Sequence, residues 1–154
     1  MMLKTGYYSG RNAFDVFFSD PSYVQVIIRE YSGTTVCHAF DEIIEQVDKQ
    51  PYLVKCYDCD LQSTRAACNL FVPKMHFHCD SCGMEAFRTS VHGKKLFTNY
   101  KDLTGIIDSD YVQYEDIIRS FHKRILSAKG ISIAQSFAAS SIIVTGEVSN
   151  FCNV

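Results

Sequence analysis

Four cysteines in the middle of the chain are arranged as two closely spaced pairs. Cys56 and Cys59 form the first pair, Cys79 and Cys82 form the second, and 19 residues separate the two pairs. Two cysteines three positions apart on a tight turn can direct both thiolates at one ion, while backbone N–H groups of the turn donate hydrogen bonds to the sulfurs. The spacing therefore predicts that all four thiolates bind a single metal ion, for which zinc is the expected choice.

The segments around the two pairs share one pattern, in which strand-like residues lead into Cys-x-x-Cys and a turn-forming residue follows. This C-x2-C-x19-C-x2-C arrangement resembles the zinc-ribbon family over residues 52–98. The resemblance implies one structural Zn²⁺ in a tetrahedral four-thiolate site with no open coordination position. Short strands are expected over Thr64–Val72 and Met75–His78, and Gly83 is expected to have the positive φ that such turns need. Removal of one thiolate should then unfold at least this insert.

Other metal-binding side chains lie close to the second pair. His76 and His78 precede Cys79, and Cys68 lies between the two pairs. Any of the three would either replace a cysteine in the site or contribute to a second site, and the sequence leaves this open. His76 and His78 are two positions apart on an expected strand, so both should lie on the face opposite Cys79.

The composition is that of a folded domain that can bury a core. Of the 154 residues, 47% are hydrophobic and 13% are aromatic, which excludes disorder over the whole length. Seven cysteines in a chain without a signal-peptide pattern favour reduced thiols and a cytoplasmic compartment, or a nuclear one. No apolar run approaches the ~20 residues of a membrane-spanning helix, so no membrane association is expected.

The segments that flank the insert, 1–51 and 99–154, are predicted to form a small α+β core that carries it. Aromatic and β-branched residues dominate Ala13–Phe18 and Tyr23–Arg29, which predicts a β-hairpin across the turn-forming sequence between them. An apolar stripe with helical spacing predicts a helix near Cys37–Lys49 that ends at the following proline. The stripe consists of Phe40, Ile43, Ile44 and Val47.

A second helix is predicted over residues 111–128, with a cap at Asp110–Gln113 and a stop at Gly130. Its acidic residues gather at the start and its basic residues at the end, as the helix dipole favours. Strands are expected at Ile131–Ile133 and Ile142–Val148. The core-facing stripe of this helix consists of Tyr114, Ile117, Ile118, Phe121 and Ile125.

Cys37 and His92 are the residues that a catalytic interpretation would use. Cys37 lies near a helix start, where the dipole and free N–H groups lower a thiol pKa. The order of Cys37, a zinc ribbon and His92 resembles papain-like viral and ubiquitin-specific proteases, which implies a nucleophile and a base. The resemblance is one of order alone, since neither their Asn-x-Cys sequence nor an aromatic residue after His92 is present. A cysteine protease is therefore a remote alternative, and the chain is predicted not to be an enzyme.

Basic residues concentrate in the middle of the chain, where residues 50–101 contain seven basic and four acidic side chains. Basic and aromatic side chains together favour nucleic-acid contact. The expected function is therefore a non-enzymatic regulatory adaptor that binds nucleic acid. The alternative is a protein-interaction module, of a size that suits a viral gene, docking by its ribbon or by the helix at 111–128. No small-molecule substrate is evident. The expected contact residues are Arg65, Lys74, Arg88, Lys94 and Lys95.

Overall fold

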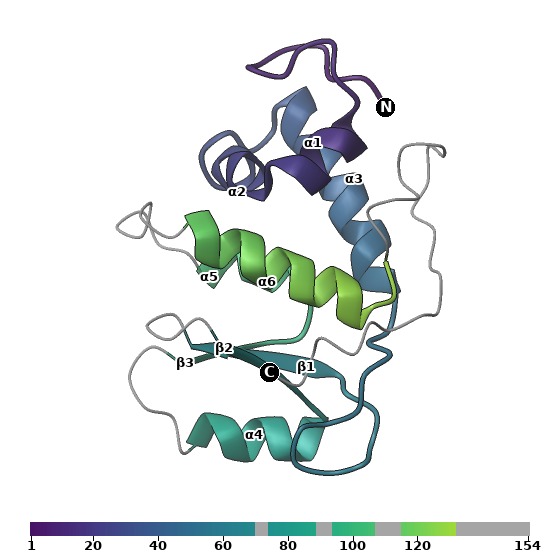
Figure 1. The fold of residues 1–154 in the computed structure, drawn as a ribbon. Coiled ribbons are helices and arrows are strands. Elements are labelled where there is room, and N and C mark those ends of the chain that lie inside the picture. The colour runs from purple at the N-terminus through teal and green to yellow at the C-terminus, as the bar shows by residue number, and fades with distance from the viewer. Residues whose placement is uncertain (70–73, 89–93, 107–114, 132–154) are drawn as a thin grey trace.

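A computed structural model of the chain describes residues 1–69, 74–88, 94–106 and 115–131, which form a small α+β structure (Figure 1). The prediction of an α+β fold is confirmed. The helices are α1 (Ala13–Ser19), α2 (Pro21–Glu30), α3 (Thr35–Lys49), α4 (Asp80–Arg88), α5 (Tyr100–Ile106) and α6 (Glu115–Ala128). The strands are β1 (Arg65–Asn69), β2 (Lys74–His78) and β3 (Lys94–Phe97).

The prediction of an N-terminal β-hairpin is wrong, because Ala13–Phe18 and Tyr23–Arg29 are helical and belong to α1 and α2. Burial in α2 follows the helical period. Val24 and Ile27 are buried, whereas Val26, which a strand would place on the same face as Val24, is 40% exposed. The strand-like composition of α1 therefore reflects burial of most of that helix, whereas α2 places its apolar residues on both a buried and an exposed side.

Side-chain caps at the helix starts explain why the turn signal was misleading. The Asp20 carboxylate accepts a hydrogen bond from the Tyr23 N–H at 3.1 Å, and Pro21 occupies the first turn of α2, where an N–H is not needed. In the same way the Asn12 side chain accepts the Phe14 N–H at 3.0 Å and begins α1. Asp-Pro thus begins a helix here and does not connect two strands.

Both predicted helices are confirmed. α3 buries its whole predicted stripe and ends before Pro51. In α6 the predicted residues Ile118, Phe121 and Ile125 are buried. The cap expected at Asp110–Gln113 and the strands expected over Ile131–Ile133 and Ile142–Val148 lie outside the described residues, apart from Ile131 itself.

The end of α6 forms a Schellman motif around Gly130, the predicted stop. Gly130 has a φ of +69°, which a residue without a Cβ adopts at little cost. Its N–H donates to the Ser127 carbonyl, and the Ile131 N–H donates to the Leu126 carbonyl, each at 2.9 Å. These two bonds satisfy carbonyl groups that the helix leaves without partners.

The three strands form one antiparallel sheet in the order β2-β1-β3. The strands predicted around Pro73 are therefore confirmed as β1 and β2. α4 covers one face of the sheet, and α5 and α6 lie over the other (Figure 1). In the sheet Ala66 is paired with Phe77, and Ala67 is paired with His76. Because directly opposed residues point to the same side, Ala66 and Phe77 lie on one face of the sheet and Ala67 and His76 lie on the other.

One hydrophobic core joins the sheet to the N-terminal and C-terminal helices, so residues 52–98 pack against the flanking segments. The Asp48 carboxylate of α3 joins the two flanking segments to each other, because it accepts the Tyr100 N–H at 2.5 Å and the Lys101 N–H at 3.1 Å at the start of α5. Core residues from all parts of the chain include Phe17, Phe40, Ala66, Met75, Phe77, Phe97 and Phe121.

Candidate metal centre

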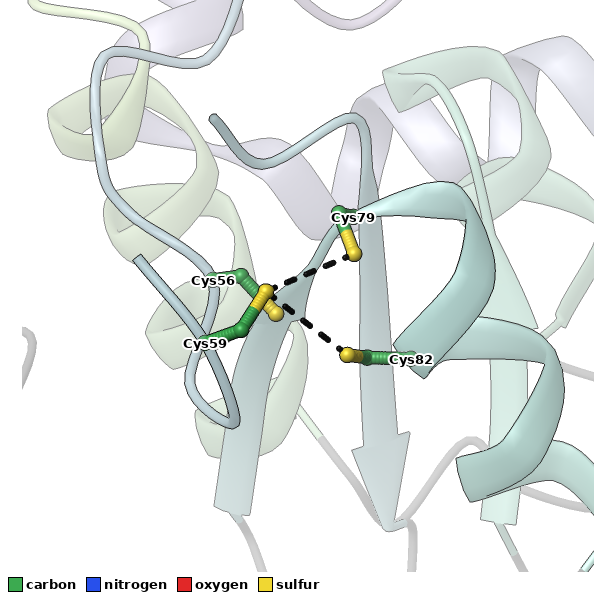
Figure 2. A group of neighbouring side chains, drawn as sticks. All are labelled: Cys56, Cys59, Cys79 and Cys82. Atoms are coloured by element: carbon green, nitrogen blue, oxygen red, sulfur yellow. Dashed lines mark hydrogen bonds between the residues drawn. The ribbon is translucent and has the colours of Figure 1, made fainter. Parts of the chain in front are cut away.

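The first cysteine pair lies on a short loop between α3 and β1. The Cys56 N–H donates to the Leu61 carbonyl at 2.8 Å and closes the loop. The Tyr57 N–H donates to the Phe77 carbonyl, also at 2.8 Å, and joins the loop to the outer edge of β2. These bonds hold Cys56 and Cys59 beside the end of that strand (Figure 2).

The second pair lies where β2 meets α4. Cys79 directly follows the strand, and Cys82 lies in the first turn of the helix (Figure 2). The Gly83 N–H donates to the Cys79 carbonyl at 2.9 Å, as the first hydrogen bond of the helix. Residues three apart lie on the same helix face, so the helical turn directs both thiols toward the loop.

The positive φ expected at Gly83 is wrong, because Gly83 lies inside α4 and has no positive φ. The absence of a side chain at Gly83 matters for the packing of α4 against the sheet. A Cβ at this position would lie 3.3 Å from Cδ of Arg65 and 3.5 Å from Cβ of His78. Glycine therefore allows α4 to approach the sheet closely enough to bring Cys82 to the loop.

The four cysteine sulfurs converge on one point from these two segments. The Sγ of Cys59 lies 3.7 Å from the Sγ of Cys79 and 3.7 Å from that of Cys82, and all four sulfurs lie within 4.8 Å of one another. Zn–S bonds of about 2.3 Å place the sulfurs of a tetrahedral site about 3.8 Å apart. The separations therefore fit a metal site, and they are far longer than the ~2.05 Å of a disulfide.

The thiols influence one another's protonation. Burial acts to raise the pKa of Cys56, but backbone hydrogen bonds from Cys79, Asp58 and Cys59 outweigh it and lower that pKa to about 7. Hydrogen bonds with the thiols of Cys79 and Cys59 raise the pKa of Cys82. Four thiolate charges held this close together would repel one another. A divalent cation at their centre would offset that repulsion.

A histidine and an aspartate lie directly beside this site. His78 Nδ1 lies 3.0 Å from Oδ2 of Asp58, and the side-chain exposure is 4% for His78 and 47% for Asp58. The ligand atoms of Cys56, Asp58 and His78 also lie within 4.8 Å of one another. The sequence left a role for His78 open but missed Asp58, although Asp58 lies inside the first Cys-x-x-Cys.

The other two residues left open by the sequence lie elsewhere. Cys68 faces the hydrophobic core, where it pairs with Met75 across the sheet. His76 lies on the opposite face, with its ring centroid 4.2 Å from that of Tyr57. Neither belongs to a metal-binding group among the residues that the structure describes.

The expected contact residues are placed only in part. Arg65 Nε lies 2.8 Å from the Asp80 carboxylate, and hydrogen bonds from Arg65 and Thr64 lower the pKa of that carboxyl. Lys74 is exposed at the start of β2. The side chains of Arg88, Lys94 and Lys95 lie outside the described part of the chain, so the set as a whole remains a prediction.

The lowered thiol pKa expected at Cys37 is wrong. Cys37 does lie in the first turn of α3, where its N–H donates to the Thr34 hydroxyl at 3.2 Å. However, burial and the nearby Asp41 carboxylate, 3.5 Å from Sγ, raise the pKa of the thiol. His92 lies outside the described residues, so the structure does not place it relative to Cys37.

Comparisons with known proteins give no information on the function of this chain. No protein-family model matches the chain, and no curated protein or solved structure matches it significantly. Within the described residues, no helix combines the length and the apolar character required to cross a bilayer. The four-cysteine cluster, with its compatibility with a metal ion, is therefore the feature on which a functional assignment depends.

Proposed function

We propose that this chain is a zinc protein in which one Zn²⁺, bound by Cys56, Cys59, Cys79 and Cys82, holds the loop to the start of α4. The observation that carries the proposal is the convergence of four sulfurs within 4.8 Å of one another, with two separations of 3.7 Å that match the edge of a ZnS₄ tetrahedron. Soft thiolates in a tetrahedral arrangement select zinc over harder divalent cations. Four protein ligands leave no open position at this ion, so its role is structural.

Metal analysis tests this proposal directly. After dialysis against metal-free buffer, the protein should retain one zinc per chain. The double variant Cys56→Ser/Cys79→Ser should retain none, and Cys68→Ala, which alters a cysteine on the opposite face of the sheet, should retain one. A wild-type protein without metal, or one that retains iron, would overturn the assignment.

The proposed molecular role of the zinc-bound module is non-enzymatic binding of single-stranded nucleic acid. Support comes from Tyr57, which lies on the loop at residues 56–60, called the zinc loop below. Tyr57 is 64% exposed, and its ring contacts the His76 ring in a tilted arrangement. Exposed aromatic rings bind bases by stacking, and nearby cations bind the phosphates. Lys74 is exposed on the same strand as His76, and the Lys55 side chain, beside the loop, is 72% exposed.

Binding measured against a salt series tests this role. Single-stranded DNA and RNA should bind more weakly as salt rises, and Tyr57→Ala should weaken binding by about tenfold, since stacking on one base contributes about 1–3 kcal/mol. Tyr31→Ala is the matched control, because Tyr31 is 53% exposed at the end of α2. Absence of binding at low salt, or equal binding by both variants, would reject the proposal.

A protein-docking role is the second candidate, and the exposed Leu61 favours it. Leu61 is 64% exposed directly after the zinc loop, next to Asp60, whose side chain is fully exposed. An apolar side chain beside a carboxylate suits a basic protein segment and disfavours phosphates. This candidate requires that nucleic acids fail to bind, and that Leu61→Ser abolishes a specific protein complex while the zinc is retained.

A further inference from the structure

Cys56, Asp58 and His78 form a second group of metal-binding side chains that adjoins the four-thiolate site and shares one residue with it. Their ligand atoms lie within 4.8 Å of one another. They come from the zinc loop and from the end of β2, which the hydrogen bond between the Tyr57 N–H and the Phe77 carbonyl holds together. The group is therefore positioned by the fold, although Asp58 and His78 are 20 positions apart in the sequence.

We propose that this group is a second divalent-cation site in which the Cys56 thiolate bridges two zinc ions. The inference rests on the four-thiolate site proposed above, because that site supplies the bridging sulfur. A thiolate has more than one lone pair and can bind two cations. The second ion would have three protein ligands, which leaves a position for water or for an external ligand, unlike the first ion.

The distances in this group fit a small metal ion. Zn–N and Zn–O bonds of about 2.0–2.2 Å place a nitrogen and an oxygen ligand about 3.3 Å apart in a tetrahedral site. The observed separation between His78 Nδ1 and Asp58 Oδ2 is 3.0 Å, so both atoms reach one ion with small side-chain shifts. Imidazole, carboxylate and thiolate together form a ligand set that zinc accepts readily.

Charge also favours a second cation here. Four thiolates around one Zn²⁺ carry a formal charge of −2, and the Asp58 carboxylate adds another negative charge beside them. His78 is nearly buried, with 4% of its side chain exposed, while Asp58 at 47% keeps the group accessible to ions from solvent. Negative charges held this close together repel one another unless a cation balances them.

Two simpler interpretations of the same contact predict different metal counts. If Asp58 and His78 only form a hydrogen bond, the protein saturates at one zinc. If His78 replaces a cysteine around a single ion, loss of His78 weakens the binding of the first zinc. In the bridged arrangement, loss of either side chain removes the second zinc and leaves the first.

Native mass spectrometry during a zinc titration separates these cases. The wild-type protein should bind one zinc at stoichiometric metal and a second at higher zinc concentration. Asp58→Asn and His78→Gln should stop at one zinc under conditions that saturate wild type. His76→Ala should still bind two, because His76 lies on the same strand face but outside the group.

Each outcome of this titration decides whether Cys56, Asp58 and His78 bind a second zinc ion. A wild-type protein that saturates at one zinc overturns the second site while leaving the first intact. A second zinc that persists in both Asp58→Asn and His78→Gln shows binding elsewhere on the chain and also overturns it. Loss of the first zinc in Asp58→Asn, whose side chain is half-exposed, would assign Asp58 to the primary site. The Cys56→Ser/Cys79→Ser variant separately tests the first site.

Discussion

His122 predicts how the stability of the folded chain depends on pH. Its side chain lies among aromatic rings, with the centroid of Phe17 at 5.1 Å and that of Tyr100 at 5.6 Å. Nδ1 lies 2.7 Å from the Tyr100 hydroxyl, while Nε2 is buried and meets no hydrogen-bond partner among the described residues. Burial therefore lowers the pKa of His122 to about 3, because a charged imidazole would lack solvation.

The sign and size of the effect follow from proton linkage. The unfolded chain binds a proton at His122 near pH 6.5, whereas the folded chain does not until about pH 3. The unfolded state thus binds more protons between these values, so stability is fully present above pH 6.5 and falls as pH decreases. Each pH unit below 6.5 should cost about 1.4 kcal/mol, so lowering the pH from 7.5 to 5.5 should also cost about 1.4 kcal/mol.

Urea unfolding followed by circular dichroism at pH 7.5 and 5.5 measures this loss. The comparison is with Tyr100→Phe/His122→Phe, which removes the imidazole and the hydroxyl together and so leaves neither group unpaired. Any metal released at low pH would be released from both proteins, so the difference between their pH responses isolates His122. The double variant should lose about 1.4 kcal/mol less than wild type over this range. Equal losses in the two proteins would refute the assignment of a neutral buried His122.

Three further predictions follow from particular backbone and thiol environments. Gly130→Ala should lower the unfolding free energy by about 1–2 kcal/mol, because the positive φ suits only glycine; an unchanged unfolding free energy in urea would contradict this. Cys37 should react with iodoacetamide more slowly in the folded than in the urea-unfolded chain, and a faster folded-state reaction would revive the protease alternative. Zinc chelation should accelerate hydrogen exchange more at the Tyr57 amide than at the Ile125 amide in α6, because the Tyr57 amide belongs to the loop that carries the cysteines. Equal acceleration at both amides would show that zinc supports the whole fold.

The features that the sequence predicted well are those with a local physical cause. The stripe of Phe40, Ile43, Ile44 and Val47 repeats with the helical period, so it identified α3 without knowledge of its neighbours. Gly130 ended α6 for an equally local reason, since the chain there needs a positive φ. Such signals depend on residues within one or two helical turns of each other.

The prediction failed at α1 and α2 because two local signals conflicted and tertiary burial decided between them. Val24, Val26 and Ile28 alternate as in a strand, yet helical burial of Val24 and Ile27 fits the core better. The N-cap Asp20 forms a hydrogen bond that a turn and a helix start both use. In α1, which is short and mostly buried, too few polar residues are present for the helical period to be visible in the sequence.

The metal centre shows how far spacing alone can predict a site. Two cysteines three positions apart point the same way on a tight turn and on the first turn of a helix, so the spacing predicted Cys79 and Cys82 as a pair but not that α4 begins between them. The approach of Asp58 to His78 was not predictable, because it depends on the pairing of the zinc loop with the edge of β2. Only the folded sheet brings those two segments together.

The position of the loop that carries Cys56 and Cys59 would give a bound metal ion a structural role beyond the four sulfurs. Among the described strands β2 lies at the edge of the sheet, and an uncovered edge invites pairing with other chains. Here the Tyr57 N–H donates to the Phe77 carbonyl at 2.8 Å, and Arg124 Nη2 donates to the Met75 carbonyl at 2.9 Å. The carbonyl groups of Met75 and Phe77 on β2 thus accept hydrogen bonds from two segments that are far apart in the sequence. Because the loop carries Cys56 and Cys59, a metal ion that holds these cysteines also keeps this edge covered.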